Sequence, residues 1–281
     1  MARHVRLREL LVGVEGLALL RHLYDGTDDD ADRRLAEVRA LLDDEAFSSG
    51  ELTSEADPQA GYASWASSYD DPGNPVIALE EPAVRSLVDP LAPGRALDAA
   101  CGTGRHARHL ADLGHDVVGV DLTPEMLGRA RVTVPEAVFL EADLLDIASF
   151  AADEFDLVVC GLALAHVADL DRATGELARV LRPGGHLVIS VLHPFQAFLG
   201  WHAPFEDEHG RRRFVRERTH THADYLAAFR AAQLHVRHCI EPALAPADVE
   251  AKRRAFRHVP DAALAAYVGL PAVLVWDTVK A

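Results

Sequence analysis

Residues 96–105 read Ala-Leu-Asp-Ala-Ala-Cys-Gly-Thr-Gly-Arg. The apolar start of this run ends in a carboxylate, Asp98, and a glycine turn follows at Gly102 and Gly104. Because glycine has no Cβ, the backbone of such a turn can approach a ligand closely. The acid at the end of the strand attracts a cation. The run therefore predicts a strand, a concave ligand site and a helix that begins near Arg105.

Three further apolar runs follow the glycine turn. They cover residues 117–121, 138–144 and 155–161, with Asp121, Asp143 and Cys160 at or near their ends. Helical segments separate these runs, and a fifth strand is expected over residues 186–191. Such alternation is typical of βαβ units in a parallel sheet with helices on both faces. Ligands of such sheets bind at the carboxyl ends of the strands, where these residues are expected.

Taken in order, residues 98–104, 117–121, 138–144, 155–161 and 179–185 resemble the class I S-adenosylmethionine-dependent methyltransferases of small-molecule type. The resemblance implies an α/β fold: a Rossmann-like seven-stranded sheet, mostly parallel, with helices on both faces. It also implies S-adenosyl-L-methionine as the cofactor. In that family the residue matching Asp121 holds both ribose hydroxyls, the one matching Asp143 accepts the adenine amino group, and the next amide, that of Leu144, meets a ring nitrogen.

The cofactor-binding residues expected on this basis share positions at strand ends or in an upstream aromatic segment. Met126 is open to a second interpretation, as an ordinary core residue. A bulky residue at the second glycine, as in Gly104→Val, is expected to abolish cofactor binding before folding. The full set is Tyr62, Tyr69, Asp98, Ala100, Gly102, Gly104, Asp121, Leu122, Met126, Asp143, Leu144 and Cys160.

A dinucleotide site is the main alternative. Residues 102–107 fit the G-x-G-x-x-A pattern, and Asp121 lies at about the distance of a ribose-binding acid. Asp98 favours S-adenosylmethionine, because a carboxylate repels a pyrophosphate and attracts an ammonium and a sulfonium. A glycine turn that only joins a strand to a helix is the third interpretation.

Composition limits the possible partners. The chain has 281 residues, 49% of them hydrophobic, which suits one α/β domain with additions. Its 28 basic and 44 acidic residues give a formal charge of −16, which disfavours nucleic acid and anionic membranes as partners. Three cysteines without a C-x-x-C pair, and no evident signal peptide or membrane span, lead us to expect a cytoplasmic protein. A homodimer remains open.

Two additions to the domain are expected. Residues 1–60 are expected to form an N-terminal helical extension with Asp28 to Asp30 between two helices. This extension either packs on the domain or on a second copy of it, or forms a lid that shapes a substrate pocket. The methyltransferase domain itself covers residues 61–281. In it, Tyr62, Trp65 and Tyr69 share one helical face, which is either core or a lid; we favour a lid that holds a sulfonium by cation–π attraction of about 0.5–2 kcal/mol.

The second addition is a flap insertion at about residues 193–221, after the fifth strand. Residues 206–210 look like a hairpin turn, and residues 213–220 alternate, so that Arg216 and Arg218 share a face that could hold a carboxylate or phosphate. Residues 234–240 and 272–277 are expected to be the last two strands, with a helix over residues 246–256 between them.

Histidine is abundant, with 15 residues, but no ligand spacing such as H-E-x-x-H occurs and no metal site is expected. His166 and His193 each follow a predicted strand and are candidate general bases; the alternative for each is a hydrogen-bonded loop histidine.

The predicted function is methyl transfer to a small-molecule acceptor, with secondary metabolism as one setting. The alternatives are a non-methylating reaction such as cyclisation or rearrangement, an NAD(P)-dependent oxidoreductase, and a non-catalytic binding protein.

Overall fold

The central sheet has seven strands in the order β10-β11-β7-β6-β3-β4-β5. The computed structural model describes residues 3–71, 74–251 and 254–281. Neighbouring strands from β5 to β7 are parallel, and β11 runs antiparallel to both β7 and β10. This arrangement confirms the expected fold class. The strands are β3 (Arg95–Ala99), β4 (Asp116–Asp121), β5 (Val138–Glu141), β6 (Phe155–Gly161), β7 (Leu181–Leu192), β10 (Leu234–Ile240) and β11 (Val273–Lys280).

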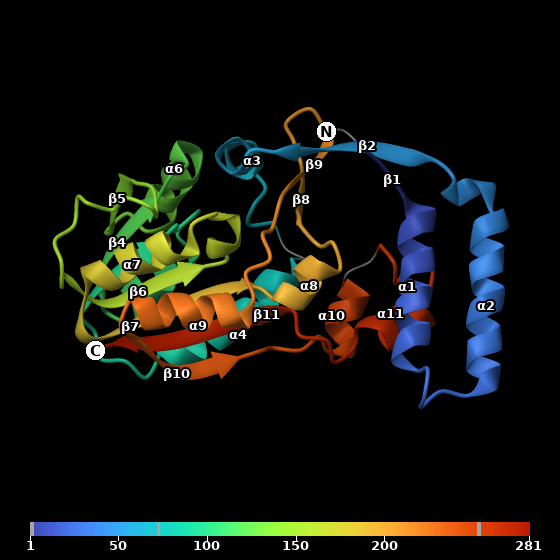
Figure 1. Ribbon diagram of the computed structural model, residues 1–281. Coiled ribbons are helices and arrows are strands. Elements are labelled where there is room, and N and C mark those ends of the chain that lie inside the picture. The colour runs from blue at the N-terminus through green and yellow to red at the C-terminus, as the bar shows by residue number, and fades with distance from the viewer. Residues whose placement is uncertain (1–2, 72–73, 252–253) are drawn as a thin grey trace.

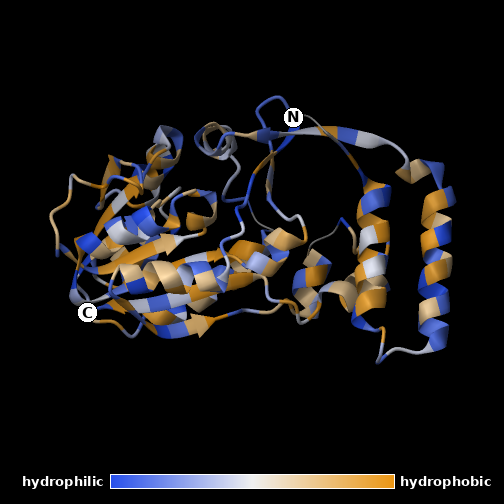
Figure 2. Ribbon diagram, in the orientation of Figure 1, coloured by the Kyte–Doolittle hydropathy of each residue, from blue (hydrophilic) through white to orange (hydrophobic). Residues whose placement is uncertain are grey.

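Helices cover both faces of this sheet, as Figure 1 shows. One apolar cluster joins the sheet to α4, α5 and α6, and a second joins it to α7 and α9. The strands between the two clusters are strongly apolar (Figure 2), because side chains on both their faces are buried. The helices are α4 (Pro75–Val88), α5 (Arg105–Asp112), α6 (Pro124–Thr133), α7 (Leu170–Val180) and α9 (His222–Ala231).

The N-terminal segment contains the two expected helices and two strands that the sequence did not predict. Asp28 to Asp30 do not separate the helices: they form the first turn of α2, where Thr27 caps the Asp30 amide and acids suit the positive end of the helix. Helix α1 packs against α11, so the extension lies on the domain. The elements are β1 (Arg3–Arg6), α1 (Leu7–Arg21), α2 (Asp28–Asp43), η1 (Glu45–Phe47), β2 (Gly50–Ala56) and α3 (Pro58–Trp65).

The two added strands join the flap in a second sheet, in the order β1-β2-β9-β8. The flap hairpin consists of β8 (Ala203–Glu206) and β9 (Arg212–Val215), so the turn at residues 206–210 is confirmed. The expected alternation to residue 220 is wrong beyond Val215. There the chain leaves the sheet, and the Arg218 amide bonds to the Ala165 carbonyl at 2.7 Å. In Figure 1, β2 extends across the molecule from the end of α2 to the start of α3.

The remaining differences lie near the last strands. Strand β7 begins at Leu181 rather than at residue 186, because Leu181 already pairs with Phe155. The expected helix over residues 246–256 is shorter, as α10 (Pro246–Ala251), and residues 252 and 253 of that expectation lie outside the described residues. Helices α8 (Pro194–Phe198) and α11 (Pro260–Tyr267) were not predicted. In the described ranges, no helix has the length and apolar character needed to cross a membrane.

Gly61 tests whether α3 depends on the second sheet. A Cβ at Gly61 would lie 2.7 Å from Val215 Cγ2 and 3.3 Å from Ala56 Cβ. We therefore expect Gly61→Ala to lower the free energy of unfolding by about 1–3 kcal/mol through overpacking. The matched control is Gly13→Ala in α1, where a Cβ meets nothing within 4 Å; it should raise the free energy of unfolding by about 0.5–1 kcal/mol. Urea denaturation of both variants measures this, and equal effects would contradict the packing described.

Candidate cofactor and acceptor site

The glycine turn lies between β3 and α5 at the carboxyl edge of the sheet. Ala100, Gly102 and Gly104 all have positive φ, of 56°, 53° and 87°. A Cβ at Gly102 would meet nothing within 4 Å, so open space lies in front of that residue. At Gly104 a Cβ would lie 3.2 Å from both Cα and Cβ of Ala130, so this glycine lets α5 pack on α6.

Asp98 lies beneath the turn and is only 1% exposed. Its Oδ2 accepts a hydrogen bond of 2.8 Å from the Ala107 amide, while its buried Oδ1 has no partner among the described residues. Burial raises the pKa of Asp98 to about 6, against the opposing effects of His106, the Ala107 amide and Arg105. An orphaned carboxylate oxygen of this kind suits a cationic ligand and not a pyrophosphate.

Asp121 ends β4 beside the turn. Its Oδ2 accepts from the Gly102 amide and its Oδ1 from the Thr123 amide, both at 2.8 Å. Each oxygen keeps a further lone pair, so the carboxylate can accept two more hydrogen bonds. Burial raises the pKa of Asp121, although the amides of Thr123 and Gly102 favour the charged form.

The other expected cofactor residues occupy varied environments. Leu122 is 42% exposed, and Leu144 and Met126 are buried. Asp143 is exposed, and its Oδ1 accepts from the Leu145 amide at 2.9 Å. Cys160 is fully buried in the core, and burial raises the pKa of its thiol.

A buried network that the sequence did not single out supports the turn from below. Glu80 of α4 is 0% exposed and accepts hydrogen bonds from Arg105, His106 and Ser190, at 2.6, 2.9 and 2.5 Å. Burial alone would raise the pKa of Glu80. The combined effect of His106, Arg105 and Ser190 is larger and lowers this pKa to about 2. The network links α4, the first turn of α5 and β7. The Glu-Glu pair at residues 80–81 looks solvated in the sequence, which gave no signal of this role.

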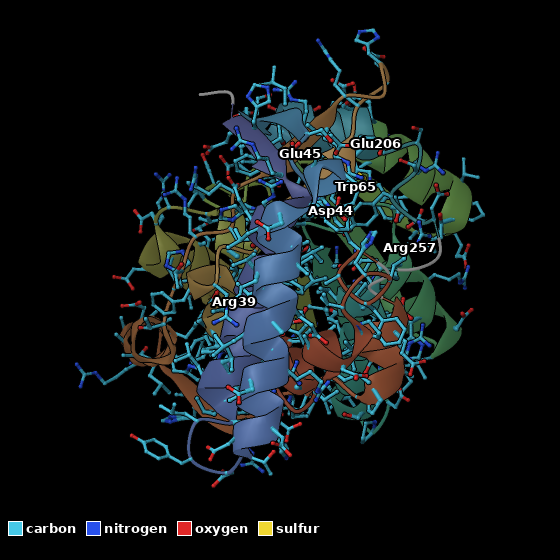
Figure 3. The ribbon with its side chains drawn as sticks, turned by 90° about the vertical axis from the view of Figure 1, so that its right-hand side faces the viewer. Arg39, Asp44, Glu45, Trp65, Glu206 and Arg257 are labelled. Carbon is cyan, nitrogen blue, oxygen red and sulfur yellow. The ribbon has the colours of Figure 1, made fainter. Side chains whose placement is uncertain are left out.

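The aromatic segment after β2 covers the turn. Gln59 Nε2 donates to the Leu122 carbonyl at 2.8 Å, and Thr103 Oγ1 donates to Asp70 at 2.8 Å. Trp65 stacks on Phe205 of the flap, with ring centroids 5.7 Å apart. Figure 3 shows Trp65 near Glu206, the last residue of β8. The segment is thus fastened to both the turn and the flap.

Tyr62 and His166 meet across this edge. The Tyr62 hydroxyl lies 2.7 Å from His166 Nε2, and His166 Nδ1 lies 3.1 Å from the Arg216 carbonyl. Because a carbonyl only accepts, Nδ1 carries the proton, and Nε2 accepts from the Tyr62 hydroxyl. Burial lowers the pKa of His166 and raises that of Tyr62, so both groups are neutral near pH 7. The lone pair of His166 Nε2 therefore points to Tyr62 of the aromatic segment.

His193 has different partners. The Phe195 amide donates to Nδ1 at 3.1 Å, so Nε2 carries the proton and donates to Glu241 at 2.9 Å. Both ring nitrogens are therefore engaged, which argues against His193 as a base. His222 also reaches Glu241, and the possible ligand atoms of these three residues lie within 4.8 Å of one another. A metal at Nε2 would require the other tautomer and loss of the Phe195 bond, so the geometry favours a hydrogen-bonded triad.

The two glycines of the turn should respond differently to substitution. Gly102→Ala adds a methyl group to open space, although at a φ of 53° that alanine tolerates poorly, so we expect a folded, slightly destabilised protein with much weaker cofactor binding. Gly104→Ala presses on α6 and imposes a strained φ, so its main effect should be on stability. The sequence-based expectation for Gly104→Val is corrected accordingly: that variant should lose the fold together with binding. Thermal unfolding and calorimetric titration with S-adenosylmethionine separate the two effects; tight binding by Gly102→Ala would contradict the assignment.

Asp98 should favour binding at the cost of stability. Its folded pKa of about 6 lies above the ordinary aspartate value of 3.8, so its contribution to stability falls as the pH rises between these values. We expect Asp98→Asn to raise the melting temperature above pH 6, by about 2–4 °C for each kcal/mol of stability gained. The same change should weaken S-adenosylmethionine binding, because the cation loses its carboxylate. An Asn variant that is less stable at pH 8 than at pH 4, relative to the parent, would contradict this account.

Comparisons with known proteins agree with this geometry. A family model described as a methyltransferase domain matches residues 97–189. An uncharacterised methyltransferase of Synechocystis is 38% identical over 114 residues, which are 40% of this chain and 53% of the relative. A demethylmenaquinone methyltransferase of Thermus thermophilus is 43% identical over 109 residues, 37% of this chain and 49% of the relative. The chain thus spans about half the length of the curated relatives it matches.

A solved structure agrees over more of the chain. The S-adenosylmethionine-dependent methyltransferase of Mesorhizobium loti has a TM-score of 0.54 and 26% identity, and the match covers 72% of this chain and 98% of that one. The matched fold and the unpartnered Asp98 oxygen favour S-adenosylmethionine over a dinucleotide, and the open space at Gly102 leaves room for either. Residues 97–189 therefore match a methyltransferase domain, and the fold is similar to that of solved S-adenosylmethionine-dependent methyltransferases.

Proposed function

We propose that this protein transfers a methyl group from S-adenosylmethionine to a hydroxyl or amine of a small-molecule acceptor. The observation that carries the proposal is the Tyr62–His166 hydrogen bond, which spans the carboxyl edge between the lid and the loop after β6. It supplies a neutral proton acceptor beside the cofactor residues. When bound, S-adenosylmethionine supplies an electrophilic sulfonium methyl group.

We assign the cofactor contacts to residues at the strand ends. Asp121 is proposed to hold the ribose through its two remaining lone pairs, and Asp98 to favour the cationic end of the cofactor. Asp143 and the Leu144 amide are proposed to hold the adenine, with Leu122 and Met126 beside it. Tyr69 and Ala100 complete the proposed set around the methionine part, and the fully buried Cys160 is proposed to support them from the core.

A small acceptor is supported by the contacts that hold the aromatic segment over the site. The lid segment is fastened to the turn by Gln59 and Asp70, and to the flap by the Trp65–Phe205 stack. The formal charge of −16 gives no general attraction to nucleic acid. A relative that acts on demethylmenaquinone, by its name, also has a small acceptor. We also propose that residues 61–281 are the catalytic domain and that residues 1–60 stabilise the flap through the pairing of β2 with β9.

The proton from the acceptor has a defined route. As the acceptor atom bonds to the methyl carbon and the carbon–sulfur bond breaks, the neutral thioether leaves and the acceptor loses a proton. The Tyr62 oxygen takes that proton as its own passes over 2.7 Å to His166 Nε2. The His166 ring is held for this by the Arg216 carbonyl. The fixed lid aligns the acceptor and excludes water, which supplies the rest of the rate enhancement.

Binding and product analysis test the proposal directly. S-adenosylmethionine should bind in calorimetry, NADH should not, and a panel of phenols, amines and other small acceptors should yield S-adenosylhomocysteine and methylated product. A rearranged or cyclised product without methyl transfer would support the non-methylating alternative. Cofactor binding without any turnover would instead leave a binding protein.

The relay predicts a specific pattern of variants. His166→Gln and Tyr62→Phe should each lower turnover by ~10²–10⁴ while the affinity for S-adenosylmethionine stays nearly unchanged. The control His209→Gln lies on the exposed flap turn and should have no effect. Because burial lowers the pKa of His166, the rate should be constant near neutral pH and fall only below the ordinary histidine range, where the imidazole becomes protonated. Near-normal rates in both variants would remove this pair from the mechanism.

A further inference from the structure

Glu217 is a buried carboxyl in the flap that the proposed mechanism does not use. Its side chain is 10% exposed, and Oε1 lies 3.8 Å from His166 Nε2. Among residues 3–71, 74–251 and 254–281, no hydrogen-bond donor reaches its carboxylate. Burial is the sole cause that raises its pKa, to about 7. A carboxyl with so little exposure and no hydrogen-bond partner is costly, and because neither oxygen is fully enclosed a ligand can reach it.

The backbone around Glu217 is fixed on both sides. The Arg216 carbonyl accepts from His166, and the Arg218 amide donates to the Ala165 carbonyl at 2.7 Å. The Glu217 amide itself lies 3.3 Å from His202 Nδ1, to which it donates. The carboxyl is therefore held beside His166 by backbone bonds and not by a pairing of its own.

The charges around Glu217 leave it without a cationic partner. His166 is neutral, because its Nε2 lone pair already accepts from Tyr62. Tyr62 and Tyr225, from α3 and α9, face Glu217 as neutral phenols whose pKa values are raised, mainly by burial. Arg216 is held away by a bidentate pair with Glu55, at 2.9 and 2.7 Å. Arg218 has an exposed side chain and does not shift the pKa of Glu217.

We infer that Glu217 is the specificity-determining residue of the acceptor site and that the acceptor presents a positively charged nitrogen to it. This inference rests on the proposed function, since it places the acceptor beside Tyr62 and His166. The charges of both Glu217 and Asp121 contribute to the raised pKa of Tyr62, after burial and Tyr69, so Tyr62 is near both carboxyls. Phenol rings beside a carboxylate suit an ammonium group through cation–π attraction. Anionic acceptors would be repelled.

The first test measures binding without turnover. Benzylamine, benzyl alcohol and benzoate are titrated by calorimetry into the protein saturated with S-adenosylhomocysteine. Benzylamine should bind at least about tenfold tighter than the other two, as expected for a charge-assisted hydrogen bond. Glu217→Gln should lose that preference, and the exposed flap control Glu208→Gln should keep it. No preference in the parent protein, or a preference kept in Glu217→Gln, overturns the inference.

The second test separates this role from support of His166. With an acceptor found by methyl-transfer assay, Glu217→Gln should raise KM for the acceptor at least about tenfold and change kcat by less than about threefold. A large fall in kcat with unchanged KM would mean that Glu217 stabilises the His166 imidazolium, and would contradict acceptor binding. Loss of the benzylamine preference in Glu217→Gln without methyl transfer to any acceptor would uphold the cation site and refute the proposed function.

Discussion

The hydrogen bonds to Glu80 are the constraint on which the rest of the site depends. This carboxylate receives Arg105 and His106 from the first turn of α5 and Ser190 from β7, with no exposure to solvent. Gly161 must lack a side chain, because a Cβ there would lie 2.6 Å from His106 Nε2. The end of β6, the start of α5 and α4 are thereby held in one arrangement. That arrangement presents Asp98 and the glycine turn to a ligand.

The same network explains how two acids remain near each other at the edge of the sheet. Arg105 and His106 favour the charged form of Asp98, although burial dominates and raises its pKa. Asp121 is supported differently, by the amides of Gly102 and Thr123. Because burial raises the pKa of both acids, keeping them charged costs stability, which is common where a protein binds a charged ligand.

The second sheet gives the N-terminal extension a role near the site. Strand β2 pairs with β9 at Ala56 and Val215, and Arg216 then pairs with Glu55 just beyond the end of the strand. These contacts fix the chain that carries Glu217 past His166. Under the proposed function, residues of the N-terminal segment thus support the chain beside the acceptor, and α1 packs on α11.

Much of the central sheet was predictable because its signals are local. Apolar runs ended by Asp98, Asp121 and Gly161 mark β3, β4 and β6, and the glycines mark the turn. The second sheet was not predictable, because its strands are short, partly exposed and paired across long separations. Glu80 could not be identified either, since its partners come from two later segments of the chain. Glu217 was overlooked because alternation drew attention to Arg216 and Arg218, on the opposite face of the expected strand.

The Tyr62–His166 pairing shows the same limit. Each residue was identified from its own neighbourhood, one from an aromatic stripe and the other from a strand end, but the sequence did not indicate that they touch across 104 positions. A crystal structure with bound S-adenosylhomocysteine tests the account most directly. We predict ribose hydroxyls within hydrogen-bond distance of both Asp121 oxygens and the sulfur atom facing the Tyr62–His166 pair. A nucleoside bound away from Asp121, or a sulfur atom turned away from that pair, would contradict it.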